Sequence, residues 1–429
     1  MECDNSTLYS RAQDLFPICR SLTGNGVRET LGYLKTFLPN LKVLEVPTGS
    51  KVYDWEVPKE WNIKNAYVKH IESNKKVIDF QDSNLHVVGY STPVNKVMDL
   101  DELKDYIHTL PDQPDAIPYI TSYYKERWGF CMTHNEFLSL SKGKYEVVIE
   151  SSLEDGYLTY GELIIPGKSK KEILLSTYVC HPSMGNNEIS GPVVTSAIAE
   201  KIQRLETREF TYRIIFIPET IGSITYISKN FEQLKENIIA GFVITCIGDD
   251  NNYSFLPSRN GSTLADRAAR CALKELRLDY KEYSFLTRGS DERQFCSPGV
   301  DLPVASIMRS KYGTYPEYHT SLDDLKFISQ EGLQGGLNAI WKALTIIEQN
   351  NIFENKILCE PQLGKRGLYP TTSTKDSGQT VREMMNILAY SDGNHDVIDL
   401  SFKLNIPFDT CLEISKKLEK NKILKRRFS

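Results

Sequence analysis

The strongest constraint in this sequence is a repeated pattern between about residues 144 and 350, where apolar runs alternate with helical stretches. The runs are rich in β-branched residues and do not alternate with polar ones: YEVVIESS, LTYGELIIPG, EILLSTYVC, YRIIFIPE, IIAGFVITCIG and LPVASIM. The segments 191–205, 222–236, 262–276 and 329–348 carry apolar residues at helical spacing. A strand that is covered on both faces of a sheet has a continuous apolar sequence of this kind, and strands that alternate with helices along the chain form parallel sheets. The pattern predicts an α/β fold with a mixed, mostly parallel sheet flanked by helices.

Two other regions have different sequence patterns. Residues 43–135 hold short aromatic-rich runs broken by Pro, Asn and Asp, which predicts a β-rich inserted domain with a short helix near 99–108. Residues 6–38 read as two helices, so the predicted catalytic domain comprises 1–42 and 136–352. Near the C-terminus, a helix, the turn SDGNHD, two further helices and the strand ILKRRF have the order of a winged helix-turn-helix, predicted over 360–429.

Composition limits the class of protein. The 429 residues include 51 Lys and Arg against 56 Asp and Glu, so a whole surface built to bind phosphate is excluded. The tail KKLEKNKILKRR is basic, which leaves a local nucleic-acid contact open, although dimerisation or packing is the favoured use of the winged helix. Nine scattered cysteines without a CxxC pair, and no signal peptide or membrane span, predict a reduced, cytoplasmic protein.

Polar residues gather where the predicted strands end. ILLSTYV is followed by Cys180 and His181, RIIFI by Glu219, and two further loops contain Asp291 and His319. Catalytic groups of open α/β sheets collect at the carboxyl ends of strands. Imidazoles and a carboxylate from several strand ends are what a catalytic zinc requires, together with open coordination positions. Only seven histidines exist in the chain, and two of them lie in these loops.

The order and spacing of these motifs resemble a known superfamily. His-x5-Asn/Asp-x-x-Ser-Gly, Pro-Glu, Gly-Ser-Asp-x-x-x-Phe and His-Thr-x-x-Asp resemble the zinc aminopeptidases, a superfamily that includes bacterial leucyl aminopeptidases and glutaminyl cyclases. The strings NLHVVGYSTPV, SYYKERWGFC, STYVCHPSM, IPETIGSI, RGSDERQFCSPG and PEYHTSLDDL look like the aminopeptidase-like family often labelled polysaccharide-biosynthesis proteins. The resemblance implies that His181 and His319 are metal ligands, Glu219 is the general base, and Asp291 is a carboxylate beside the metal.

The sequence departs from the two-zinc pattern of that superfamily. The bridging aspartate falls at Asn187, the second glutamate of the paired set is replaced by Thr220, and Cys246 stands where a strand-end aspartate is expected. Because a neutral amide is a poor zinc ligand, one zinc ion is favoured over two. Glu188 is the alternative to Asn187 as the third ligand.

We therefore expect a zinc-dependent hydrolase of the aminopeptidase type that cleaves an amide bond near a free amine of a small peptide or peptide-like substrate. Arg288, Arg293 and Tyr318 border the expected site and are predicted to bind substrate. The run SYYKERWGF suggests that the insertion covers the site. The alternatives are a catalytically weak peptidase fold that senses a ligand while its winged helix binds nucleic acid or a protein, and an amidase or deacylase acting on an amino sugar. Self-association is left open, and no membrane partner is expected.

Overall fold

The structure, a computed structural model, describes residues 5–368 and 375–427. Contacts divide the chain into two units. The first runs to Thr263 and resumes over Tyr280–Asn338, and the second comprises Leu264–Asp279 and the chain from Ala339 onward. Within the described ranges, each helix is too short or too polar to cross a lipid bilayer.

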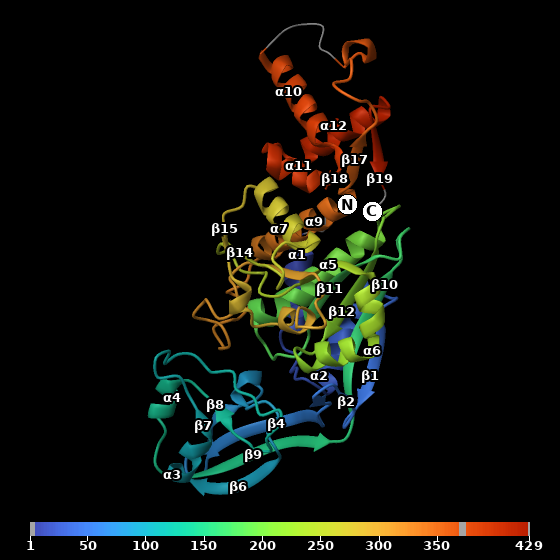
Figure 1. Cartoon of the computed structure of the whole chain (residues 1–429). Helices are drawn as coiled ribbons and strands as arrows, with labels where there is room; N and C mark the ends of the chain where they lie inside the picture. The colour runs from blue at the N-terminus through green and yellow to red at the C-terminus, as the bar shows by residue number, and fades with distance from the viewer. Residues whose placement is uncertain (1–4, 369–374, 428–429) are drawn as a thin grey trace. The chain divides into compact units, whose positions relative to one another are not determined.

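The first unit is built on an eight-stranded sheet, which confirms the predicted mixed α/β fold (Figure 1). The four central strands run parallel to one another, as expected for strands buried on both faces. The edges add antiparallel pairs. In spatial order the strands are β1 (Lys42–Pro47), β10 (Tyr157–Ile165), β12 (Thr211–Ile217), β11 (Glu172–Tyr178), β13 (Ile238–Val243), β16 (Val304–Met308), β14 (Tyr253–Leu256) and β15 (Tyr280–Glu282).

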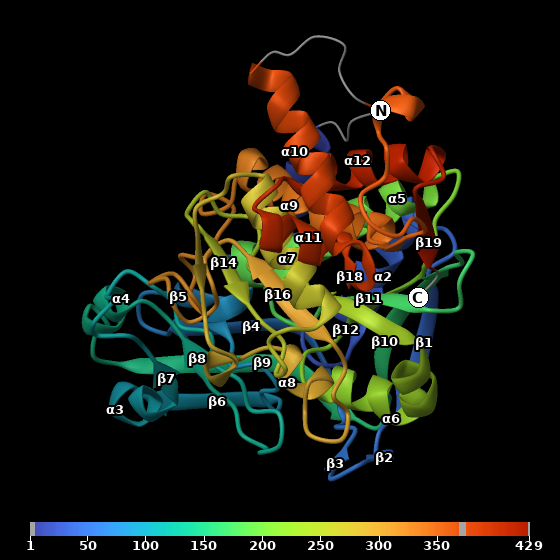
Figure 2. The same ribbon diagram turned by 45° about the horizontal axis from the view of Figure 1, so that its top comes forward.

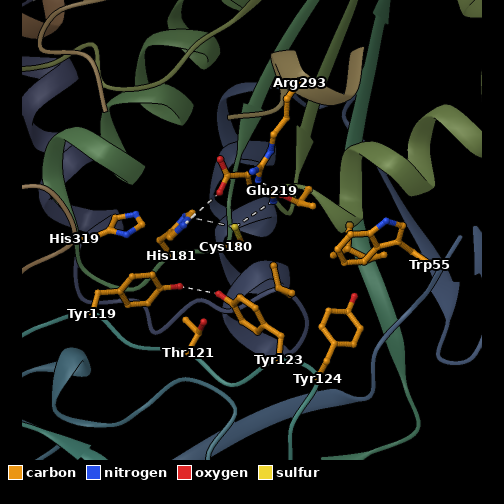
Figure 3. A pocket seen from close by; sticks show the side chains of 13 residues that line it. Trp55, Tyr119, Thr121, Tyr123, Tyr124, Cys180, His181, Glu219, Arg293 and His319 are labelled. Atoms are coloured by element: carbon orange, nitrogen blue, oxygen red, sulfur yellow. Dashed lines mark hydrogen bonds and ion pairs between the residues drawn. The ribbon is translucent and has the colours of Figure 1, made fainter. Parts of the chain in front are cut away.

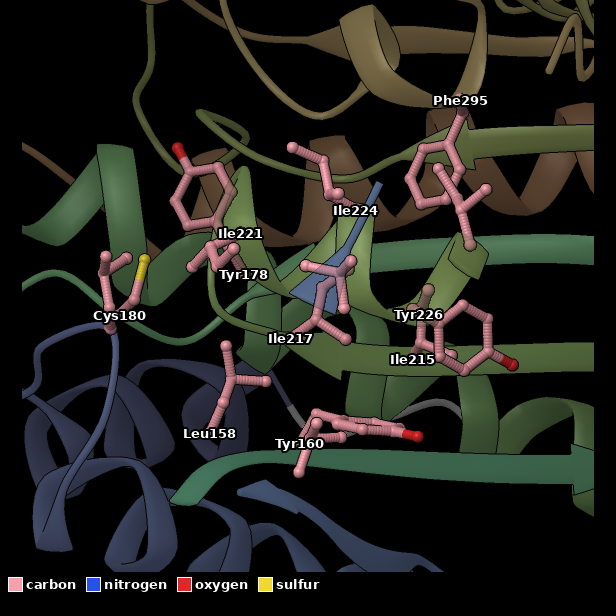
Figure 4. Close-up of a cluster of buried hydrophobic side chains, with 14 of the residues drawn as sticks. Leu158, Tyr160, Tyr178, Cys180, Ile215, Ile217, Ile221, Ile224, Tyr226 and Phe295 are labelled. Atoms are coloured by element: carbon pink, nitrogen blue, oxygen red, sulfur yellow. The ribbon is translucent and has the colours of Figure 1, made fainter. Parts of the chain in front are cut away.

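Helices pack on both faces of this sheet. A Cβ atom at Gly161 of β10 would lie 2.9 Å from Leu31, which places α2 (Asn25–Phe37) on one face. The neighbouring Tyr160 points the other way, into an apolar cluster that also contains Ile221 and Ile224 of α6 (Ile221–Asn237) (Figure 4). Contacts join α2 and α1 (Asn5–Leu15) to α5 (Ser190–Gln203), and join α6 to α8 (Glu292–Phe295). These helices hold the strand-end loops in place.

The inserted region forms a second, antiparallel sheet with the order β5-β4-β9-β6. Its strands are β5 (Lys75–Asp79), β4 (Glu60–His70), β9 (Lys144–Glu154) and β6 (Val94–Asp99), of which β4, β9 and β6 lie side by side in Figure 2. Two short pairs, β2 (Lys51–Val52) with β3 (Trp55–Glu56) and β7 (Ile107–His108) with β8 (Phe130–Cys131), and the helices α3 (Leu100–Leu103) and α4 (His134–Leu138) complete this region.

One strand assignment from the sequence is wrong. The run YEVVIESS lies in β9, which pairs with β4 and β6 of the inserted sheet and not with the central sheet. Its inward residues, Tyr145, Val147 and Ile149, fill the insert's own core with Ala66 and Val68. An apolar run of this length shows that a strand is buried, but it does not show which sheet buries it.

The second unit contains the winged helix that the sequence predicts. Its sheet has the order β18 (Asp392–Asp396), β17 (Ile352–Asn355) and β19 (Leu424–Arg427). Its helices are α10 (Lys375–Tyr390), α11 (Val397–Leu404), α12 (Phe408–Lys420), α7 (Leu264–Glu275) and the last part of α9 (Gln330–Gln349). The pattern predicts a turn at SDGNHD, but most of this segment forms β18, which pairs with β17.

Contacts within the second unit surround the start of α12. The Phe408 backbone N–H donates to the Glu275 carboxylate at 3.0 Å, and Lys342 forms an ion pair with Asp409 at 2.7 Å. Arg267 pairs with Asp396 and Asp399, which form the capping box at the start of α11. Because α7 and the end of α9 cluster with the winged helix, this unit is larger than the segment 360–429 predicted for it.

Candidate active site

Three loops at the ends of strands bring the predicted chemistry together. His181 follows β11, Glu219 follows β12, and His319 lies in the loop after β16 (Figure 3). The Nε2 atom of His181 is 3.7 Å from a carboxylate oxygen of Glu219, and the rings of His181 and His319 are 5.6 Å apart between centroids. Residues separated by up to 138 positions therefore face one cavity.

Glu188 lies behind His181. Its carboxylate is 2.9 Å from Nδ1 of His181, and its other oxygen is 3.4 Å from Arg20. Arg20 also donates from Nε to the His181 carbonyl at 3.0 Å. A carboxylate on Nδ1 favours the tautomer that leaves the Nε2 lone pair facing the cavity. Burial, reinforced by the positive charge of Arg20, lowers the pKa of His181 to about 3, so its imidazole is neutral at pH 7.

Asn187 lies in a π-helical turn, Gly185–Ile189, that leads into α5. Its side-chain oxygen accepts a hydrogen bond from the Tyr178 hydroxyl at 3.0 Å, and its buried amide nitrogen Nδ2 has no hydrogen-bond partner among the described residues. The buried Asp323 accepts hydrogen bonds from the backbone N–H groups of Asn186 and Asn187, at 2.6 and 2.9 Å. Asp323 closes the motif His-Thr-x-x-Asp, but no local pattern indicates that it holds this turn.

The backbone beside Glu219 is strained. Thr220 has φ 63°, a conformation that β-branched residues avoid. Asp291 holds it there, because one carboxylate oxygen accepts hydrogen bonds from the Thr220 N–H at 2.8 Å and from Ser223 Oγ at 2.7 Å. The other oxygen of Asp291 is buried and finds no partner in the part of the chain that the structure describes. Burial, together with the charge of Asp291, raises the pKa of Glu219 to about 8.

The predicted substrate-binding residues differ in position. Arg293 lines the cavity together with Glu219 and Thr220. Tyr318 stacks on His319 with 3.9 Å between ring centroids. Arg288 is exposed, lies over the ring of Phe285, and does not line the cavity.

The cavity has a volume of about 410 Å³, and aromatic residues form its wall opposite Glu219 (Figure 3). Tyr123 and Tyr124 of this wall belong to the run SYYKERWGF, whereas Tyr119 and Trp55 lie outside the motifs that mark the site in the sequence. The Tyr119 ring lies 5.4 Å from His181 and 5.1 Å from His319 between centroids, and its hydroxyl is 2.7 Å from that of Tyr123. Trp128, the tryptophan of the suggested lid, does not line the cavity and stacks on Tyr106.

The segment that carries this wall is fixed to the loop of His319. The Tyr119 N–H donates to the His319 carbonyl, and the Ser321 N–H donates to the Ile117 carbonyl, each at 2.9 Å. The Ile117 N–H donates to the Ser321 hydroxyl at 2.9 Å. The inserted region is therefore part of the site.

The residues present fit a zinc ion. His181 offers a neutral imidazole, and burial lowers the pKa of His319 to about 3, so it offers a second. The Glu219 carboxylate faces Nε2 of His181. Cys180, His181 and Glu188 also place one ligand atom each within 4.8 Å of one another. Of these, Cys180 accepts a hydrogen bond from the Glu219 N–H at 3.2 Å, and Glu188 faces Arg20.

The fold and the loops at the strand ends define an aminopeptidase-like protein. A family model described as a domain of unknown function (DUF4910) matches residues 9–350, and a winged helix-turn-helix model matches residues 351–426. The chain belongs to the DUF4910 family.

Relatives support this assignment. A Clostridium acetobutylicum protein, named as a polysaccharide biosynthesis protein with an aminopeptidase-like domain, is 47% identical over 94% of this chain and 92% of its own length. A crystal structure of a peptidase-like protein from the same organism has a TM-score of 0.93 and 44% identity, covering 99% of this chain and 96% of that one. A zinc aminopeptidase from Bacillus subtilis shares the fold, with a TM-score of 0.58 and 12% identity over 80% of this chain and 95% of that one.

Proposed function

We propose that this protein is a zinc-dependent hydrolase of the aminopeptidase type that cleaves an amide bond near a free amine of a small peptide-like substrate. One observation carries the proposal. The Nε2 atom of His181 faces the Glu219 carboxylate at 3.7 Å, beside the ring of His319, in a cavity large enough for a small substrate. The relative named as having an aminopeptidase-like domain supports the same reaction class.

His181 and His319 would hold the ion, with a third ligand from Asn187 or Glu188. Because Glu188 contacts Nδ1 of His181, we assign it to orienting the imidazole, and Asn187 remains the candidate for the third ligand. When bound, zinc supplies Lewis acidity toward a scissile carbonyl and a water molecule.

Glu219 would take the proton of the attacking water and pass it to the leaving amine. The raised pKa of Glu219 lets it hold a proton near neutral pH, whereas the positive charge of Arg293 favours its ionised form. Asp291 is fully buried and does not line the cavity, so we assign it to holding the Thr220 turn beside Glu219 rather than to contact with the substrate.

The test combines metal analysis with hydrolysis of aminoacyl amides. We expect about one zinc per chain, and we expect Glu219→Gln to lower kcat by about 100- to 10,000-fold while zinc content is retained. Glu317→Gln, in the loop of His319, is the matched control and should keep its activity. Equal turnover by wild type and Glu219→Gln would refute the assigned base.

The neutral residues Asn187, Thr220 and Cys246 favour one other candidate, a peptidase fold that binds its ligand with weak or no turnover. Zinc-loaded protein that binds peptide without hydrolysing it would support this candidate. An N-acetylated amino sugar belongs in the substrate panel, because the name of the Clostridium acetobutylicum relative refers to polysaccharide biosynthesis.

A further inference from the structure

One arginine of the cavity, Arg293, is bonded to a hydroxyl rather than to an acid. It donates from Nη2 to the Thr220 hydroxyl at 2.5 Å, and its buried Nε atom has no hydrogen-bond partner within the described ranges. Among residues 5–368 and 375–427, Arg293 forms no ion pair, although its positive charge acts on Glu219 and Asp291 and partly offsets the rise in the pKa of each that burial causes. Arg293 is half-buried, and a guanidinium at a cavity wall is well suited to bind a carboxylate, because its fork of N–H groups matches two oxygens.

The surroundings of Arg293 indicate where a ligand anion would lie. Figure 3 shows the end of the Arg293 side chain beside Glu219, on the far side of the cavity from Tyr119. Glu219 is the group assigned to protonate the leaving amine, so Arg293 lies on the side of the leaving group. When the leaving group is an amino acid, its carboxylate is only one carbon away from that amine.

We propose that the site takes dipeptide-like substrates, and that Arg293 binds the carboxylate that follows the scissile amide. This inference rests on the proposed function. It narrows the substrate class from any amide near a free amine to one that carries an amine and a carboxylate on its two sides. The volume of about 410 Å³ suits a ligand of two residues.

The aromatic wall of the cavity favours a substrate that carries a ring or another apolar group. Trp55 and Tyr124 lie at the cavity, are 41% and 58% exposed, and meet edge to face with 5.8 Å between ring centroids. Exposed aromatic rings at a cavity are sites for apolar contact. A phenyl group is therefore a suitable probe.

The first experiment measures binding without turnover. L-phenylalanine and 2-phenylethylamine differ only in the carboxylate, and neither contains an amide. Calorimetry on the zinc-loaded full chain should show that phenylalanine binds about 10- to 100-fold more tightly than the amine. Arg293→Gln should bring this ratio close to one, and Arg293→Lys should keep part of it because it retains the charge but loses the fork.

Arg288→Gln is the matched control, since Arg288 lies outside the cavity, and it should keep the wild-type ratio. Equal binding of the two probes by the wild type would overturn the proposal. The proposal would also be overturned if Arg293→Gln kept the same ratio as the wild type, because the metal alone would then hold the carboxylate. Loss of the ratio in Arg288→Gln would also overturn it, because the preference would then come from the general charge of the surface.

The second experiment compares hydrolysis of the dipeptide Ala-Phe with that of its C-terminal amide. The wild type should favour the free carboxylate in kcat/KM by about 10- to 100-fold, and Arg293→Gln should remove the preference through KM. A wild type without this preference would contradict the proposal. It is possible to separate this proposal from the proposed function. If neither peptide is hydrolysed, but the wild type binds phenylalanine more tightly than 2-phenylethylamine and Arg293→Gln loses that difference, the proposed function is refuted and the carboxylate site is retained.

Discussion

At the residue scale, His181 depends on the groups behind it. Glu188 is 1% exposed and faces Nδ1 of His181 at 2.9 Å, so it fixes which nitrogen is free to bind a metal. We expect Glu188→Gln, which keeps the shape but replaces the carboxyl group with an amide, to weaken zinc binding by about 10- to 100-fold without unfolding the protein. Competition with a chromogenic chelator measures the affinity. Unchanged affinity would show that Glu188 does not orient the ligand, and Glu102→Gln on the surface of α3 is the control.

At the element scale, strand β4 is tied to helix α2 by an ion pair. Glu60 accepts hydrogen bonds from Arg28, Asn62 and the Tyr157 N–H, and the bonds from Arg28 contribute most to lowering the pKa of Glu60 to about 2. A lowered pKa stabilises the fold above the ordinary pKa near 4.5, and this contribution is lost as pH falls toward 2.

We therefore expect Glu60→Gln to lower the free energy of unfolding by about 1 to 2 kcal/mol at pH 7. This value is already reduced for solvent screening, because Arg28 is partly exposed. The difference from wild type should shrink steadily below pH 4.5. Urea unfolding at pH 7, 5 and 3 measures it. A difference that stays constant across this range would contradict the assignment of the stabilisation to the ionised Glu60.

Also at the element scale, α12 is the helix that would enter a DNA groove in a winged helix-turn-helix. Such helices read bases with their N-terminal residues. Here Glu275 accepts from the Phe408 N–H, and Lys342 pairs with Asp409, so this end is already engaged by α7 and α9. We therefore expect that the amount of the full chain retained on DNA does not fall steeply as the salt concentration rises from about 50 to 200 mM. Steep loss of retention with salt, weakened by Lys416→Gln, would show that the helix binds DNA after all.

At the scale of the whole molecule, the inserted region and the loop of His319 are joined by backbone hydrogen bonds at Ile117, Tyr119 and Ser321. We expect zinc to slow amide hydrogen exchange in residues 117–123 as well as around His319, because an ordered His319 loop orders the segment bonded to it. Exchange measured with and without chelator tests this, and β18 serves as the reference segment. Protection confined to the loops that bear the ligands would contradict the coupling.

Much of this molecule could be predicted from local patterns. Apolar runs and helical spacing indicate the mixed α/β sheet, and three short helices followed by a strand indicate the winged helix. The strand-end rule predicts that His181, Glu219 and His319 lie together, and they do, because parallel strands bring their carboxyl ends to one edge. These features depend on periodicity and on strand direction, which the sequence carries directly.

Which groups share a wall of the cavity or a sheet depends on long-range packing. Tyr119 reaches His319 because backbone hydrogen bonds join two segments about 200 positions apart, and β9 enters the inserted sheet because Tyr145 and Val147 fit that core. The π-helical turn Gly185–Ile189 brings Glu188 back to Nδ1 of His181, seven positions away, and the packing around Arg293 leaves its Nε atom without a partner among the described residues. Local patterns in the chain are enough to predict the helices, the strands and the reactive side chains. The partners of those side chains depend on packing between segments far apart in the chain, and such a contact leaves no periodic pattern in the sequence.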